Sequence, residues 1–183
     1  MGYEQPDNIY FQEGKICHRI IQDHVARIKT DKALKHILVH FPIVEVVDFD
    51  PQCKFSFKVG DHIFRGFYDG LDWKNKRFLE IKSSSTLWTV GKFQQAIQRK
   101  IYALANPILE EAYLITCSRK PSDWTTQLPK VFKVPLTNQD REEALTWIKD
   151  SIKMIEAGEF TSDLVDGKCV DPRCYWGANC QFK

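Results

Sequence analysis

The stretch from Gly66 to Lys82, GFYDGLDWKNKRFLEIK, decides the fold and the chemistry of this 183-residue chain. Its last four residues, 79–82, alternate between apolar and charged side chains, which predicts a strand with Glu80 and Lys82 on the same face. The residues before the polar turn predict a preceding strand that ends at Asp69. Two carboxylates and one ammonium group are therefore expected to meet on one face of a sheet.

The flanking sequence predicts one α/β domain, because helical and strand periodicities alternate along the chain. We expect helices near residues 14–29, 31–39, 91–105 and 139–157, and strands near 43–49, 54–59, 62–69, 78–81, 111–117 and 130–136. The strands between 54 and 81 are predicted to form antiparallel hairpins. Residues 159–183 show little periodicity and are predicted to form a loop-rich tail of the same domain, which spans 1–183.

The composition is that of a globular protein, with 43% hydrophobic and 27% charged residues. The net charge of +2 excludes a histone-like or polybasic-tail mode of nucleic-acid binding and leaves room for a local basic groove. No apolar run reaches the roughly 18 residues of a membrane span, and the first residues are acidic and polar rather than signal-like. A cytoplasmic, intracellular location is expected.

The paired carboxylates suit a hard divalent cation such as Mg2+ or Mn2+, which prefers oxygen ligands. Such a cation polarises a phosphodiester and lowers the pKa of a bound water, while Lys82 could orient that water or stabilise developing negative charge. The alternative is a surface sheet with a cross-strand ion pair. Motifs of P-loop enzymes, dinucleotide-binding folds, zinc peptidases and α/β-hydrolases are absent from the sequence.

Four short motifs follow one another in a characteristic order. They are Gly-x-x-x-His at 14–18, Gly-x-x-Asp at 66–69, Glu-x-Lys at 80–82 and Gln-x-x-x-Tyr at 98–102. In this order they resemble the RecB-like exonuclease branch of the PD-(D/E)XK nuclease superfamily. The resemblance covers roughly residues 14–105 and extends weakly to the helix near 139–157.

The resemblance implies a restriction-endonuclease-like core, a mixed central β-sheet flanked by helices. It implies that the ligands of Mg2+ or Mn2+ are His18, Asp69, Glu80 and the backbone carbonyl of Ile81. It makes Lys82 the catalytic lysine, and Gln98 and Tyr102 would brace the site or contact DNA phosphate.

The implied activity is that of a metal-dependent deoxyribonuclease, an exonuclease on DNA ends or single strands, in recombination, repair or viral DNA processing. A prokaryotic or viral origin is expected. Two alternatives stay open: a structure-specific endonuclease, and a catalytically silent DNA-binding or assembly module on the same scaffold. The chain carries no helicase segment, so it is expected either to act alone or to depend on a helicase or recombination partner. The sequence leaves its oligomeric state open.

The tail carries three closely spaced cysteines, Cys169, Cys174 and Cys180. Some members of the resembled family hold a 4Fe–4S cluster with one N-terminal and three C-terminal cysteines, which would make Cys17 or Cys53 the fourth ligand. The first gap here is four residues rather than the usual two, and Cys17 lies inside the first motif. A Zn2+ site and free thiols are the alternatives.

Basic and aromatic residues near the motifs predict DNA contacts, because phosphate contacts dominate affinity and aromatic rings stack on unpaired bases. The expected DNA-binding residues are Lys92, Arg99, Lys100 and Trp88. Lys54 and Lys58 line one face of the predicted hairpin and extend the basic track. Solvated lysines and half-buried tryptophans are the simpler explanation for each of them alone.

Overall fold

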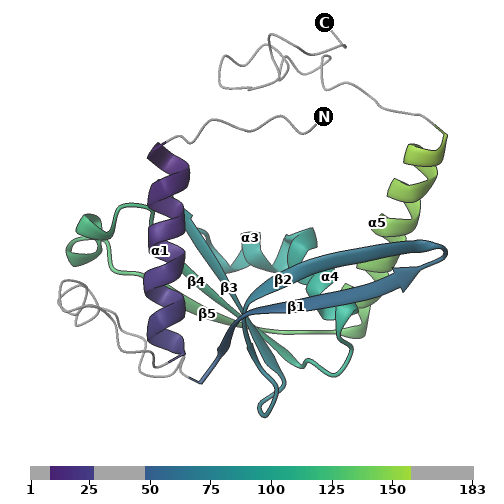
Figure 1. Ribbon diagram of the computed structural model, residues 1–183, viewed down its shortest axis with the longest axis horizontal. Helices are drawn as coiled ribbons and strands as arrows, with labels where there is room; N and C mark the ends of the chain where they lie inside the picture. Colours follow the sequence, from purple (N-terminus) through teal and green to yellow (C-terminus); the bar gives the residue numbers. More distant parts are fainter. Residues whose placement is uncertain (1–8, 27–47, 158–183) are drawn as a thin grey trace, which may run out of the picture.

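The computed structural model describes residues 9–26 and 48–157 and is built on a five-stranded sheet (Figure 1). The strands are β1 (Asp50–Val59), β2 (His62–Asp72), β3 (Arg77–Ser84), β4 (Glu111–Ser118) and β5 (Lys130–Pro135), hydrogen-bonded in that order. The sheet is mixed, because β3 and β4 run parallel while all other neighbours are antiparallel. This confirms the predicted α/β fold with a mixed sheet.

Helices cover both faces of the sheet (Figure 1). They are α1 (Ile9–Val25), α3 (Val90–Gln95), α4 (Ile97–Ala105) and α5 (Asn138–Glu156), with a 3-10 helix η1 at Pro121–Thr125 that the sequence did not indicate. The helices α3 and α4 lie in the crossover between the parallel strands β3 and β4, which a hairpin could not connect.

Two hydrophobic cores result, one on each face of β3. Residues of α1 such as Ile20 and Ile21 pack with Leu79 and Ile81 on one face. The α4 residues Tyr102 and Ala103 pack in the other core, together with Phe78 and residues of β4 and β5. Strand alternation therefore sends Glu80 and Lys82, which share the face of Phe78, toward α4.

The helix expected over 91–105 is broken at Ala96, whose extended backbone (φ −64°, ψ 119°) separates α3 from α4. Of the apolar residues at helical spacing in this stretch, Phe93 is consequently buried, whereas Ile97, Ile101 and Leu104 are half-buried. The buried residues of α4 are Arg99, Tyr102 and Ala103.

The remaining helices differ from expectation at their ends. α1 begins at Ile9 and ends at Val25. α5 starts at a capping box formed by Thr137 and Asp140, and Ile155 near its end is 61% exposed. The expected helix 31–39, most of the expected strand 43–49 and the tail 159–183 lie outside the described residues. In the part of the chain that is described, no helix has the length and apolarity to cross a membrane.

Candidate active site

The site forms where β2 and β3 separate. Backbone pairing between the two strands ends at Gly70 and Leu79, so the next residues no longer face a ladder partner. The Asp69 side chain replaces the missing backbone acceptor, because its Oδ2 accepts a hydrogen bond of 2.8 Å from the Ile81 N–H. This contact holds the acidic side chain against β3 beside Glu80.

Glu80 is a buried carboxylate with one unsatisfied oxygen. The residue is 3% exposed, and Oε1 forms an ion pair with the Lys82 ammonium. Oε2 has no hydrogen-bond partner among the described residues. Burial, followed by the nearby charge of Asp69, raises the pKa of Glu80 to about 7 despite the opposing effect of Lys82. The ionised site therefore carries more negative charge than its surroundings stabilise.

Lys82 is held in place by a short chain of side chains that ends at α4. Its Nζ donates a 2.7 Å hydrogen bond to Gln98 Oε1, and Gln98 Nε2 donates one of 2.8 Å to the Tyr102 hydroxyl. Burial, and then the charge of Glu80, raises the pKa of Tyr102, so this hydroxyl stays protonated at neutral pH. The Trp88 ring, whose centroid lies 5.2 Å from Lys82 Nζ, covers another side of the ammonium.

One face of α1 borders the site from the opposite side. His18 Nδ1 lies 3.5 Å from Asp69 Oδ1, and Gln22 Nε2 donates a 3.2 Å hydrogen bond to the Asp69 carbonyl. A Cβ on Gly14 would meet Ser83 Oγ at 3.4 Å, so the helix approaches the end of β3 closely there. These three α1 positions are spaced four residues apart and therefore share one face. Gln22 was not predicted, although its spacing from His18 could have indicated it.

A cleft of about 880 Å³ opens between α1 and the β1–β2 pair. Its lining includes Lys15, His18, Arg19, Gln22, Gln52 and Asp69. Cationic and amide side chains, together with the carboxylate of Asp23, thus surround the opening next to Asp69. A negatively charged chain could lie in this cleft with a phosphate at the carboxylates.

Gly66, the first residue of the Gly-x-x-Asp motif, has a packing role. A Cβ at this position would come within 2.4 Å of Phe55 Cζ on the paired strand β1. The Phe55 ring packs against Tyr68 and Tyr102, with centroid distances of 5.0 and 5.3 Å. The absent side chain therefore lets an aromatic cluster form beside the strand end that carries Asp69.

Cys17 does not face the site. Its side chain is fully buried, and its thiol donates to the carbonyls of Ser118 and Arg119, at 3.6 and 3.0 Å, where β4 ends. The structure places Cys17 in the core formed by α1 and the sheet, which does not support a cluster or zinc ligand there. The other candidate ligands Cys169, Cys174 and Cys180 lie outside the described residues.

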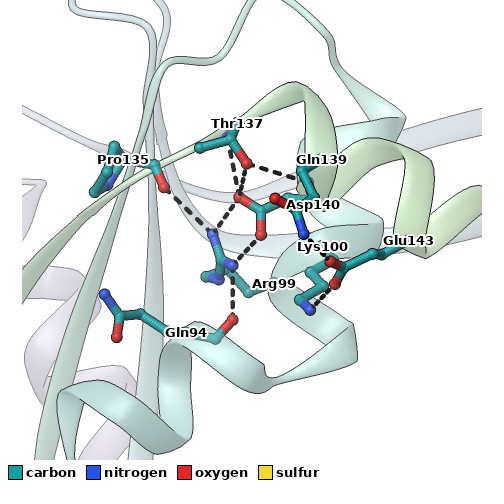
Figure 2. A network of polar contacts seen from close by, with 8 residues as sticks. All are labelled: Gln94, Arg99, Lys100, Pro135, Thr137, Gln139, Asp140 and Glu143. Carbon is teal, nitrogen blue, oxygen red and sulfur yellow. Dashed lines mark hydrogen bonds and ion pairs between the residues drawn. The ribbon is translucent and has the colours of Figure 1, made fainter.

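The predicted DNA contact of Arg99 is wrong, because this residue is 3% exposed and its guanidinium lies in a buried network (Figure 2). Its two terminal nitrogens lie 3.0 and 2.5 Å from the carboxylate oxygens of Asp140, and one also donates to the Gln94 carbonyl at 2.7 Å. Lys100 pairs with Glu143 of α5. Both cations therefore connect α4 to α5 rather than facing the cleft.

Lys92 and Trp88 do lie near the site. Lys92 is exposed and its Nζ lies 4.4 Å from the Trp88 ring centroid, the same ring that Lys82 approaches. A DNA contact of these two residues stays a prediction.

The carboxylates of Asp69 and Glu80 are suitable ligands for a divalent cation. Within residues 9–26 and 48–157, no three His, Cys, Asp or Glu side chains converge as a complete metal-binding group. Mg2+, however, is commonly held by one or two carboxylates and completed by water and substrate phosphate. The unsatisfied Oε2 of Glu80, next to Asp69, matches that requirement.

The fold and the site define an α/β protein with a carboxylate pair and a lysine where two strands diverge. No protein-family model matches the chain, and no curated protein matches it. Among solved structures, it is similar to SSO0001, with a TM-score of 0.50 and 14% identity over 98% of this chain and 89% of the other. It is also similar to a protein from Eubacterium rectale described as a "Putative exonuclease", with a TM-score of 0.53 and 12% identity over 87% and 71%. These similarities concern the fold.

Proposed function

We propose that the protein is a Mg2+- or Mn2+-dependent nuclease that hydrolyses phosphodiester bonds of DNA and acts as an exonuclease on DNA ends or single strands. The observation that carries the proposal is the buried, half-unsatisfied Glu80 carboxylate between Asp69 and Lys82. A buried carboxylate such as Glu80 is costly beside a second acidic side chain without a cation, and Asp69 lines the cleft, so the arrangement favours metal binding. The fold similarity to the Eubacterium rectale protein described as a "Putative exonuclease" agrees with this proposal.

Asp69 and Glu80 would hold the metal, and His18 and the Ile81 carbonyl are proposed to complete the ligand set. When bound, the metal supplies positive charge at the scissile phosphate and lowers the pKa of a water. The hydrogen bond from Ile81 fixes the orientation of Asp69 before substrate arrives. The chain's part is thus to preorganise its carboxylates, which keeps reorganisation small during the reaction.

Lys82 would hold a proton at Nζ and donate hydrogen bonds to a phosphate oxygen or to the attacking water. Gln98 accepts from Nζ and is itself oriented by Tyr102, so the ammonium has a defined direction. Glu80 forms an ion pair with this ammonium group and balances part of its charge. Gln98 and Tyr102 therefore act as positioning residues for Lys82.

The test is cleavage of end-labelled single- and double-stranded DNA in Mg2+, Mn2+ or EDTA, by wild type and by the Lys82→Ala and Glu80→Gln variants. We expect metal-dependent cleavage that both substitutions reduce by a hundred-fold or more, on the order of other charge-stabilising groups. Lys133→Ala is the matched control, because this lysine pairs with Glu111 on the β4–β5 side of the sheet. Cleavage that persists in both variants contradicts the proposed site, and DNA binding without cleavage in either metal favours a silent binding module.

A further inference from the structure

The outer face of the β1–β2 hairpin alternates cations with apolar side chains. The register places Lys54 opposite Phe67, Ser56 opposite Arg65 and Lys58 opposite Ile63, so these side chains share one face of the hairpin. All of these six residues are exposed. We refer to them together as the hairpin face: Lys54, Ser56, Lys58, Ile63, Arg65 and Phe67.

The opposite side of the hairpin already has partners. The Phe55 and Tyr68 rings pack against Tyr102 of α4, and His62 pairs with Glu156 of α5 at 3.0 Å. Figure 1 shows the hairpin extending past the rest of the sheet, alongside α5. Only the opposite side of the hairpin therefore packs against the rest of the protein. Packing does not explain the mixture of cationic and apolar residues on the hairpin face.

An aromatic ring among cations matches the chemistry of unpaired nucleotides. Phe67 is 54% exposed, and Lys54 Nζ lies 5.9 Å from its ring centroid. Lys58 approaches Asp61 at 3.5 Å, but both side chains are well exposed, so salt screens this pair and a phosphate can compete with it. Rings that stack on bases and cations that track the backbone characterise surfaces for single-stranded nucleic acid.

The hairpin face continues into the candidate active site. Gln52 lies two residues before Lys54 on β1, at a position where the backbone is left-handed (φ 51°). It lines the cleft together with Asp69 and donates to Gln22 on α1 at 3.4 Å. On β2, Phe67 precedes Asp69 by two residues, or about 7 Å along the strand. A base stacked on Phe67 would thus lie close to a phosphate held at the carboxylates.

We propose that the hairpin face binds the single-stranded part of a DNA substrate, with an unpaired base on Phe67 and phosphates at Lys54 and Arg65. The inference rests on the proposed nuclease function and adds the surface that delivers the strand to the site. It also explains why a protein of nearly neutral net charge places three cations on one short hairpin.

Binding measured without cleavage separates this proposal from the catalytic one. The full-length protein in EDTA would be titrated onto a fluorescent oligothymidylate and, separately, onto a blunt duplex of equal length, with anisotropy as the readout. We expect Phe67→Ala to weaken single-strand binding about five- to a hundred-fold, since one stacked base contributes that much. Phe67→Leu, which keeps the apolar surface and loses the aromatic ring, should weaken it nearly as much.

Two further variants define the role of the surface. Lys54→Ala and Arg65→Ala should each lower affinity and reduce the slope of log K against log salt by about 0.7, the value for one phosphate contact to a single strand. Trp147→Ala is the matched control, because Trp147 is 50% exposed but lies on α5, outside the hairpin face. Its binding should equal that of wild type.

The possible results are distinguishable. Unchanged single-strand binding by Phe67→Ala, or an equal loss for single strand and duplex, overturns the proposed single-strand surface, whether or not the enzyme cleaves DNA. An equal-length RNA that binds more tightly than DNA and loses affinity in Phe67→Ala overturns the assignment of DNA as the ligand. Wild-type cleavage that depends on Lys82, combined with normal binding and cleavage by Phe67→Ala, removes this inference and leaves the proposed function intact.

Discussion

The carboxylate of Asp69 accepts a hydrogen bond from the backbone N–H of Ile81 at 2.8 Å, at the point where β2 and β3 stop pairing. One acidic side chain thus satisfies a backbone donor that the departing strand leaves without a ladder partner. The same bond sets Asp69 beside Glu80, the neighbour of Ile81. The separation of the strands and the pairing of the two carboxylates therefore have one structural cause.

Asp69→Asn should separate these two roles. The amide oxygen can still accept from Ile81, so we expect the folded structure and its melting temperature to change little. The negative charge is lost, so metal-dependent DNA cleavage should fall by about a hundred-fold or more. Asp69→Leu, which loses both functions, should also lower the melting temperature. Full activity in Asp69→Asn, measured with end-labelled DNA in Mg2+, is incompatible with a ligand role for Asp69.

Glu80→Gln should stabilise the metal-free protein at alkaline pH. Burial and the charge of Asp69 raise the folded-state pKa of Glu80 from 4.5 to about 7, so the ionised side chain favours unfolding. The stability linked to its protonation is fully present below pH 4.5 and is lost as the pH rises through 7. In EDTA at pH 8.5 the variant should gain on the order of 2 kcal/mol over wild type, and the difference should shrink toward pH 4.5. A variant that is less stable at pH 8.5 than at pH 5, relative to wild type, contradicts this sign.

Divalent cations should stabilise the wild-type protein through the same carboxylates. Under the proposed function, Mn2+ or Ca2+ would bind the folded state only, so thermal unfolding should shift upward with metal concentration, and more at pH 8 than at pH 6, where Glu80 is largely protonated. EDTA should reverse the shift. The Glu80→Gln variant should show little of it, whereas Lys133→Ala should respond as wild type does. An equal shift in Glu80→Gln places the metal elsewhere.

The sheet could be predicted from the sequence because its signals are local. Alternation over residues 54–59 and 78–82 defined strands close to β1 and β3 and placed Glu80 and Lys82 on one face, which the structure confirms. The apolar run at 111–117 also predicted β4. Strand periodicity depends only on neighbouring residues, so it can be recognised without knowledge of the tertiary fold.

The errors involve partners that are distant in sequence. Arg99 is next to Gln98 and is basic, which favours a DNA contact when only its own helix is considered. Its actual partner, Asp140, is 41 residues away on α5 and buries it. The break at Ala96 and the core position of Cys17 likewise depend on packing against other elements. No local pattern in the sequence encodes these contacts.

Asp140→Asn should destabilise the protein in a pH-dependent way. Burial alone would raise the pKa of Asp140, but the hydrogen bonds from Arg99 and Thr137 outweigh it and lower the pKa. The stability that this pair provides is present above the ordinary pKa of an aspartate and is lost as the pH falls through the lowered value. Loss of one partner of a buried ion pair costs about 3 kcal/mol, so urea unfolding at pH 7 should show that difference.

The comparison needs a control, since any substitution on α5 could weaken the helix. Glu143→Gln removes the half-exposed partner of Lys100 on the same helix, and its free energy of unfolding should differ little from that of wild type. The difference in the free energy of unfolding between Asp140→Asn and wild type should narrow as the pH falls below the ordinary pKa of an aspartate toward the lowered pKa of the wild-type carboxylate. A pH-independent loss in Asp140→Asn would instead assign the effect to the capping box at Thr137.

Gly66→Ala should destabilise the hairpin because the new methyl group meets the Phe55 ring at 2.4 Å. The half-buried ring packs against Tyr68 and Tyr102 and would have to shift relative to them, so we expect a cost of about 1–3 kcal/mol from overpacking. Phe55→Leu leaves space for the methyl group, so the double variant should be less destabilised than the sum of the single changes. Additive losses in this double-mutant cycle, measured by urea unfolding, contradict the steric role of Gly66. If the strand end at Asp69 depends on this packing, Gly66→Ala should also reduce DNA cleavage, and Phe55→Leu should partly restore it.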